Sequence, residues 1–424
     1  MNAVSTVTGS TGARVLALPV ARGAALVAVL GTAISPPLVN LAAAIMLCAF
    51  ALVPDAGARL RHVCNEPLGR AILILLAVLA LAALFSTAPL LQALDALWGW
   101  RTLLLCFVGL ALFDDARAQR RVAVAVIATA VLAVAVLTVL QDQAALTRDA
   151  NAPQLVLLRN NVTQAMFLAV AAYLACMLLV TRQFSARTPQ VLLGLAALVL
   201  LLRLLFVETG RSGHVLLLVA FAASVVLGLH GLRRWVALLV VPLVAVIVYV
   251  ASPQLQARFG KGIAELGNAS QAAELTSMGV RQVMWRGTVD LIAERPLRGY
   301  GLGAFGAVYS QRAKSQSGWR AIASTDPHNQ YLFLWVEAGL LGIVAFAWWL
   351  IAATRQPAAP LARTLALGLL AGWCVTSLFS SHFQTFNESH LITLLLGVFL
   401  ARPASTAGSQ AMPSVPNAAP RTAA

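Results

Sequence analysis

The sequence predicts an all-α, polytopic membrane protein with about twelve transmembrane helices and a helical loop domain outside the membrane. Of its 424 residues, 60% are hydrophobic and only 11% are charged. Soluble domains carry roughly 25% charged residues, so this chain needs lipid as its solvent. Its apolar runs approach the ~20 residues with which a helix crosses a bilayer, whereas a transmembrane barrel would show short alternating segments. Helices follow because backbone groups in hydrocarbon must be hydrogen-bonded within their own segment.

Twelve apolar stretches, each flanked by charge, are the candidate spans. Their approximate limits are residues 15–34, 38–53, 69–86, 91–113, 121–140, 161–181, 189–208, 212–230, 235–251, 328–351, 361–380 and 389–402. We expect a bundle of about nine transmembrane helices over residues 1–251, a long loop over 252–327 and C-terminal transmembrane helices over 328–402. Residues 403–424 are rich in Ala, Ser, Pro and Thr, which predicts a disordered tail.

The arginines outside the long loop gather at one end of these spans. That side holds Arg14, Arg22, Arg59, Arg61, Arg70, Arg117, Arg120, Arg121, Arg182, Arg187, Arg233, Arg234, Arg355, Arg363 and Arg402. The short connections of the other side hold only Arg148, Arg159 and Arg211. By the positive-inside rule the arginine-rich side is cytoplasmic. We therefore expect a multi-pass protein of a bacterial inner membrane, with both termini cytoplasmic and the 252–327 loop periplasmic.

Several site classes are unlikely on composition. The formal net charge of +15 does not indicate nucleic-acid binding, since the basic residues lie mostly between apolar spans. The five cysteines are scattered, without a CxxC pair or a Cys/His cluster, which argues against a zinc site and a disulfide framework. The outer face has few acids and no paired carboxylates of the kind that hold a divalent ion beside a phosphate. We expect neither a metal nor a cofactor.

The long loop is basic, with nine Lys and Arg residues against five acids. The basic residues are Arg258, Lys261, Arg281, Arg286, Arg295, Arg298, Arg312, Lys314 and Arg320. Guanidinium groups bind phosphate through two parallel hydrogen bonds, so arginines at an outer face beside lipid suit an anionic lipid headgroup. A solvated charged surface is the alternative for any single arginine.

The first candidate site is the turn Thr209-Gly210-Arg211-Ser212-Gly213-His214 between two spans. Its glycines and small hydroxyl side chains let a backbone approach a phosphate, and Arg211 would face the outer membrane surface. An ordinary tight turn explains the same residues equally well.

The second candidate site lies in the loop, where Arg281 and Trp285 are four residues apart and share one face of a predicted helix. Arg281 would meet a negative charge while Trp285 anchors at the membrane interface. The helix is expected to stop before Pro296, and the glycine-rich run Gly299-Tyr300-Gly301-Leu302-Gly303 follows it. No strand precedes these glycines, so they are not a nucleotide-binding fingerprint.

The third candidate site is Asp326-Pro327-His328-Asn329, which opens the tenth span. A histidine at a helix N-terminus is favoured in its neutral form by the helix dipole and by partial desolvation, and neutral imidazole is what a general base needs. A structural interfacial histidine is the alternative. Glu337, inside the same span, marks either packing or function, because an unpaired charge there is costly. Gly339 and Gly342 indicate close helix packing.

Together these three places resemble the superfamily of O-antigen ligases and O-antigen polymerases, which includes protein O-oligosaccharyltransferases. The resemblance covers the span layout and three local patterns. They are the small-residue turn around Arg211, the Gly279/Arg281/Trp285 region with Pro296-x-x-Gly299-x-Gly301, and His328-Asn329 with Glu337-x-Gly339-x-x-Gly342. The Gly-Arg pair of the family is split here by Val280, which leaves Arg286 as the alternative to Arg281.

The resemblance implies a metal-independent, inverting glycosyltransferase whose donor is a glycan on undecaprenyl diphosphate. It implies that Arg211 and Arg281, or Arg286, hold the diphosphate and that His328 deprotonates the acceptor hydroxyl. Four further residues would support the site: Asp326, Asn329, Trp285 and Glu337.

Among the activities of the superfamily we favour a ligase with lipid A–core as acceptor, because the chain has a single compact outer loop and no C-terminal periplasmic extension. An O-antigen polymerase and a protein O-oligosaccharyltransferase are the alternatives within the superfamily. A transporter or flippase for lipid-linked sugars would show polar residues deep in many spans, whereas this chain has only Arg22, Asp95, Arg101, Arg203 and Glu337. A non-catalytic scaffold would tolerate loss of His328.

Overall fold

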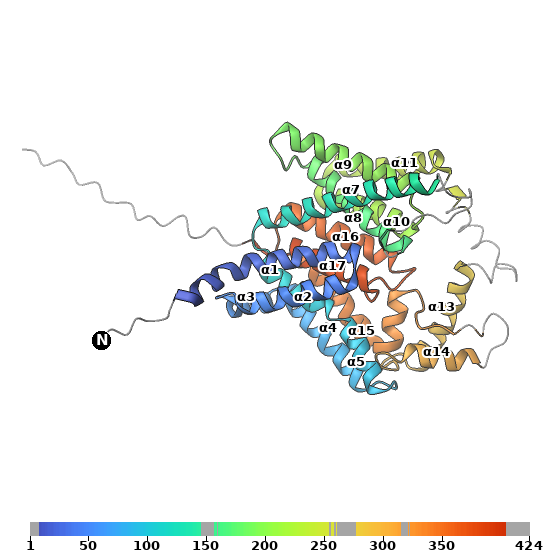
Figure 1. The fold of residues 1–424 in the computed structure, drawn as a ribbon. Coiled ribbons are helices and arrows are strands. Elements are labelled where there is room, and N and C mark those ends of the chain that lie inside the picture. The colour runs from blue at the N-terminus through green and yellow to red at the C-terminus, as the bar shows by residue number, and fades with distance from the viewer. Residues whose placement is uncertain are drawn as a thin grey trace, which may run out of the picture.

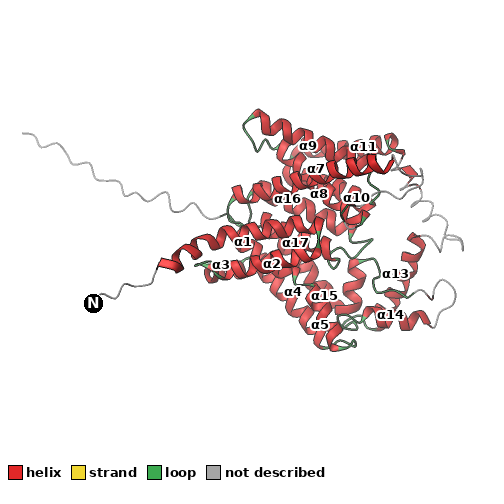
Figure 2. Ribbon diagram, viewed as in Figure 1, coloured by secondary structure: helices red, strands yellow, loops and turns green. Residues whose placement is uncertain are grey.

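The structure is a computed structural model that describes residues 8–145, 157–158, 160–253, 256–257, 260, 277–314, 321 and 323–403. In these residues the chain is helical and contains no strand (Figure 2). The predicted disordered tail, apart from Pro403, and the loop residues Arg258, Lys261 and Arg320 lie outside the described part.

The helices run side by side as a bundle, with two further helices at one end (Figure 1). Their bounds are α1 Thr8–Ile34, α2 Pro36–Ala51, α3 Ala56–Asn65, α4 Pro67–Leu84, α5 Leu90–Gly99, α6 Thr102–Leu112, α7 Ala116–Ala145, α8 Asn161–Val180, α9 Arg187–Phe206, α10 Arg211–Gly228 and α11 Gly231–Ala251, followed by α13 Ser277–Glu294, α14 Phe305–Lys314, α15 Gln330–Arg355, α16 Pro360–Thr376 and α17 Phe386–Phe399. All twelve predicted spans coincide with helices. The predicted all-α polytopic membrane class is confirmed.

Nine helical segments of the described chain are long and apolar enough to cross a membrane. They are Leu16–Ile34, Pro67–Leu84, Leu90–Leu112, Ala116–Leu140, Asn161–Val180, Arg187–Phe206, Arg211–Gly228, Gly231–Ala251 and Gln330–Arg355. The other three predicted spans differ in form. The second is followed by a 105° bend between α2 and α3, where Pro54 interrupts the helix. The last two are the shorter apolar helices α16 and α17.

The helix α17 is the most enclosed of the short helices. It has 14 residues, and every residue from Asn387 to Phe399 is buried. A helix of this length is about 21 Å long, less than the ~30 Å of a hydrocarbon core. Backbone that is not helical is tolerated at membrane depth only where protein covers it or a cavity admits water. In the preceding α16–α17 connection, residues 377–385, Ser381, His382 and Phe383 are buried, whereas Leu378 and Phe379 are exposed.

Three arginines predicted to lie within the spans contact nearby polar groups. Arg22 forms an ion pair with Asp114, and Arg203 lies 2.9 Å from the carboxylate of Glu208 with both side chains buried. Arg101 falls at the break between α5 and α6, where it donates to the Asn40 side chain at 3.0 Å. These contacts remove the cost of leaving a charge without a partner in a low-dielectric interior.

Candidate active site

The segment between α13 and α14 is hydrogen-bonded to α15 at a point where that helix is interrupted. Gly339 has a φ of +66°, so α15 leaves helical geometry there and the carbonyls before it become free to accept other hydrogen bonds. The backbone N–H groups of Tyr300 and Gly301 donate to the carbonyls of Val336 and Glu337, both at 2.8 Å. The loop and α15 are therefore joined backbone to backbone.

Glycines permit this close approach. A Cβ on Gly299 would lie 2.7 Å from the Val336 carbonyl oxygen, and one on Gly339 would lie 2.3 Å from the Leu297 carbonyl oxygen. No side chain fits at either position. The patterns Pro296-x-x-Gly299-x-Gly301 and Glu337-x-Gly339, which are far apart in sequence, form the two halves of one contact.

Glu337 completes the same contact. Its side chain is buried, and Oε1 accepts a hydrogen bond from the Gly303 backbone N–H at 2.9 Å, just before α14 begins. Glu337 therefore anchors the start of α14 to α15, and its supporting role in the site stays a prediction.

Three basic residues of the loop serve its own structure. Arg312 of α14 forms ion pairs with Asp290 at 2.7 Å and Glu294 at 2.8 Å, both on α13. The guanidinium carbons of Arg295 and Arg298 lie 4.6 and 5.2 Å from the ring centres of Tyr300 and Phe85. Such contacts hold a loop in shape and leave these arginines less suited to binding a substrate.

The α13 helix carries Arg281 and Trp285 to the α16–α17 connection. The ring centres of Trp285 and Phe379 are 6.0 Å apart, and the charge of Arg281 acts on the buried His382. Both predicted residues therefore lie on one face of α13, as their spacing of four indicated. Arg286 is exposed and makes no hydrogen bond or ion pair with the described residues, so the structure separates it from Arg281.

The start of α15 lies against the same connection. Asn329 caps the helix, accepting from the N–H groups of Tyr331 and Leu332 at 3.0 and 3.1 Å, and its side-chain amide donates to the Leu378 carbonyl. The Gln330 N–H donates to the Ser377 carbonyl at 2.9 Å, and its side-chain oxygen accepts from the Phe383 N–H at 3.0 Å.

Asp326 and His328 are held within this network. Asp326 Oδ1 accepts hydrogen bonds from the Ser381 hydroxyl and from the His328 backbone N–H, both at 2.7 Å. His328 has a φ of +53°, a left-handed conformation that few side chains adopt. The imidazole ring is half-buried and forms no hydrogen bond with the described residues. The backbone is thus fixed while the ring is left available to a substrate.

His382 is a candidate that the sequence reasoning missed. It is 1% exposed, and neither ring nitrogen has a hydrogen-bond partner among the described residues. Burial, and then the positive charge of Arg281, lower the pKa of His382 to about 4. The ring is therefore neutral at physiological pH. Its sequence signal was a histidine in a short polar stretch, Ser380-Ser381-His382, between two apolar runs.

Arg211 occupies the first position of α10, at the same end of the bundle as α13 (Figure 1). The flanking Gly210 and Gly213 pack against α8, where an added Cβ would lie 2.4 Å from the backbone carbonyl oxygens of Asn161 and Ala165. Arg211 makes no hydrogen bond or ion pair with the described residues. Arg211 therefore lies at the same end of the bundle as the other candidate residues, but no hydrogen bond or ion pair in the described part of the chain links it to them.

No group of three His, Cys, Asp or Glu side chains in the described part of the chain is arranged to hold a metal ion. Metal independence nevertheless remains a prediction, since it concerns the reaction. What the structure does assemble is one cation, Arg281, and two histidines, His328 and His382, around the α16–α17 connection.

Known proteins resemble this chain over a region that contains candidate residues of the site. The profile of a family described as O-antigen ligase matches residues 196–347, which include Arg211, Arg281 and His328. An O-antigen ligase of Salmonella typhimurium is 33% identical over 79 residues, which are 18% of this chain. The match spans about a fifth of the length of that relative, 20%.

Proposed function

We propose that this protein is a glycosyltransferase that moves a glycan from undecaprenyl diphosphate to lipid A–core, and the match of residues 196–347 to the family described as O-antigen ligase supports this proposal. The reaction would take place at the periplasmic face of the inner membrane. The observation that carries this proposal is that Arg281 of α13 and the segment Asp326–Asn329 both lie on the α16–α17 connection.

Arg281 would bind the diphosphate of the donor. A guanidinium group forms two parallel hydrogen bonds with a phosphate and stabilises the negative charge that grows on the leaving group. Burial strengthens this attraction because the local dielectric constant is lower than that of water. Arg211 would add a second positive charge from the start of α10.

His328 would act as the general base. The acceptor hydroxyl oxygen attacks the anomeric carbon from the face opposite the diphosphate, and its proton passes to the imidazole of His328. The bond between the anomeric carbon and the diphosphate oxygen breaks, and undecaprenyl diphosphate leaves with the electron pair. Attack from the opposite face inverts the anomeric configuration. Asp326 and Asn329 would position the ring by fixing the backbone on either side of it.

The product of a reconstituted transfer reaction distinguishes the proposed ligase activity from the alternative activities. Purified protein receives a glycan on undecaprenyl diphosphate, lipid A–core and a chelator, with each substrate omitted in parallel. We expect the glycan on lipid A–core only when both substrates are present, and we expect the chelator to have no effect.

Lengthening of the lipid-linked glycan without lipid A–core would identify a polymerase instead. Transfer to an added protein acceptor but not to lipid A–core would identify an O-oligosaccharyltransferase. Movement of the lipid-linked glycan across a vesicle membrane without transfer would contradict an enzyme and identify a flippase.

A further inference from the structure

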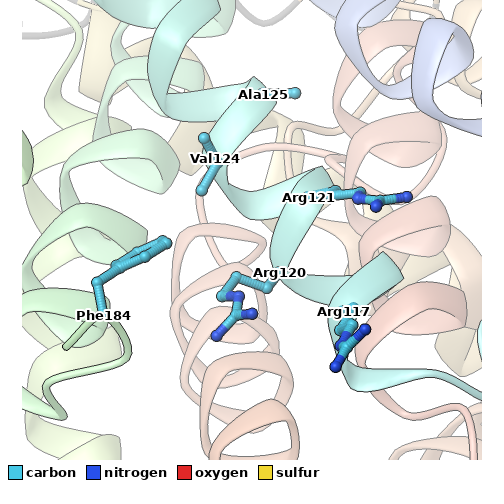
Figure 3. Close-up of a pocket in the computed structure, with 6 residues that line it drawn as sticks. All are labelled: Arg117, Arg120, Arg121, Val124, Ala125 and Phe184. Carbon is cyan, nitrogen blue, oxygen red and sulfur yellow. The ribbon is translucent and has the colours of Figure 1, made fainter. Parts of the chain in front are cut away.

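A cavity of about 370 Å³ lies at the start of α7, at the end of the bundle opposite α13 and α14 (Figures 1 and 3). It is lined by Arg117, Arg120, Arg121, Val124 and Ala125 of α7 and by Phe184 of the α8–α9 connection. The volume falls within the roughly 300–1,000 Å³ typical of small-molecule sites. Because none of these residues belongs to the candidate active site, the cavity needs a separate explanation.

One wall of the cavity is held in place by direct contacts. Arg120 donates a hydrogen bond to the Gln183 carbonyl at 3.0 Å, and its guanidinium carbon lies 5.3 Å from the centre of the Phe184 ring. Figure 3 shows Phe184 facing the side of α7 that carries Val124 and Arg120. An arginine and an aromatic ring are therefore fixed in contact with each other in this wall.

The guanidinium groups of this site are not paired with carboxylates of the described protein. Arg117 lies three and four residues before Arg120 and Arg121, spacings at which like charges on a helix repel. None of the three guanidinium groups forms an ion pair with a described carboxylate. Nearby Asp114 pairs with Arg22 and Arg59, and Asp115 accepts from the Arg117 backbone N–H. The N-terminal end of the α7 dipole adds further positive potential. A bound anion would remove this repulsion.

The apolar residues of the cavity indicate which kind of anion binds there. Val124, Ala125 and Phe184 line it beside the arginines, and α7 from Ala116 to Leu140 is a candidate membrane span. A free phosphate would use only the arginines. A phospholipid would place its phosphate among the arginines and its glycerol and acyl carbons against the apolar residues. Basic pockets between helices are known to hold lipid headgroups in this way. We propose that this cavity binds the headgroup of an anionic phospholipid.

Lipid selectivity of the full-length protein tests this site. The protein in detergent is mixed with equal amounts of dioleoyl phosphatidylglycerol and dioleoyl phosphatidylcholine, and native mass spectrometry counts the bound lipids. We expect a preference of about tenfold for phosphatidylglycerol. The triple variant Arg117→Gln, Arg120→Gln, Arg121→Gln should lose that preference, and Arg121→Gln alone should weaken it about fivefold.

A matched control removes the same charge elsewhere on the arginine-rich side. Arg187, Arg233 and Arg355 are exposed, stand at helix ends and do not line the cavity, so their joint replacement by Gln should keep the preference. Equal loss in this control would mean that general surface charge, not the cavity, selects the lipid. Unchanged selectivity in Arg121→Gln and in the triple variant would also overturn the proposal. Full displacement of the lipid by millimolar inorganic phosphate would show a free-anion site in place of a lipid site.

Discussion

Arginine occurs at both ends of the helical bundle, but the surroundings differ. At one end, Arg281 is partly buried beside the neutral His382, on a helix whose loop is joined backbone to backbone with α15. At the other end, Arg117 and Arg121 are exposed, and Arg120 is fixed only by a carbonyl and an aromatic ring. Sequence treats all of them as basic residues at a membrane surface. Burial and fixed neighbours distinguish an arginine suited to catalysis from arginines suited to binding lipid.

Among the arginines, the largest expected effect comes from Arg281. We expect Arg281→Ala to lower the transfer rate about 10²–10³-fold, the loss typical of removing one group that stabilises developing negative charge. Arg286→Ala should lose much less, because that side chain is exposed on another face of α13. Initial rates of glycan transfer compare the two, with Arg187→Gln as a variant far from the site. If Arg286→Ala lowered the transfer rate more than Arg281→Ala, Arg286 would be the residue that binds the diphosphate.

The second effect concerns the joint between the loop and α15. Gly339→Ala should lower the thermal unfolding midpoint and cost at least about 1–3 kcal/mol, because the new side chain needs a positive φ and collides with the Leu297 carbonyl. Transfer should fall with it as Arg281 loses its position. Gly23→Ala is the control, since a methyl group there meets nothing within 4 Å. An unaltered midpoint in Gly339→Ala would show that the loop does not depend on this joint.

A third effect is a pH dependence of stability. Because the pKa of His382 is lowered from 6.5 to about 4 in the folded protein, the unfolded chain binds more protons in that interval. Stability should therefore fall as the pH falls from 6.5 to 4. Replacing His382 by Gln should flatten this fall, and Arg281→Ala should flatten it in part, because Arg281 contributes to the lowered pKa. Thermal unfolding midpoints measured across this pH range test the expectation. The same change of midpoint with pH in the wild type, His382→Gln and Arg281→Ala would contradict the lowered pKa of His382.

Hydropathy and local motifs predicted most of the fold and part of the site. The twelve apolar runs became helices because lipid leaves a backbone few alternatives. The spacing of Arg281 and Trp285 predicted a shared face because helical geometry is local. His328 was singled out because a histidine at the start of a span is recognisable in sequence, and the structure then showed that Asn329 caps that helix.

Contacts between distant segments were not predictable. Nothing local shows that Glu337 reaches Gly303, or that Gly299 and Gly339 are parts of one joint. His382 was missed for the same reason, since its importance comes from α13, about a hundred residues earlier. The cavity at α7 was also hidden, because Phe184 joins Arg120 only after α7 and α8 have packed.

The role of His328 is decided by single-turnover glycan transfer with His328→Asn. Asparagine tolerates the positive φ found at this position, so the backbone and its hydrogen bond to Asp326 should be kept while the base is removed. With folding verified by an unchanged thermal midpoint, we expect transfer to fall about 10²–10⁴-fold, the contribution typical of a general base. Transfer at the wild-type rate by this folded variant would contradict His328 as the base.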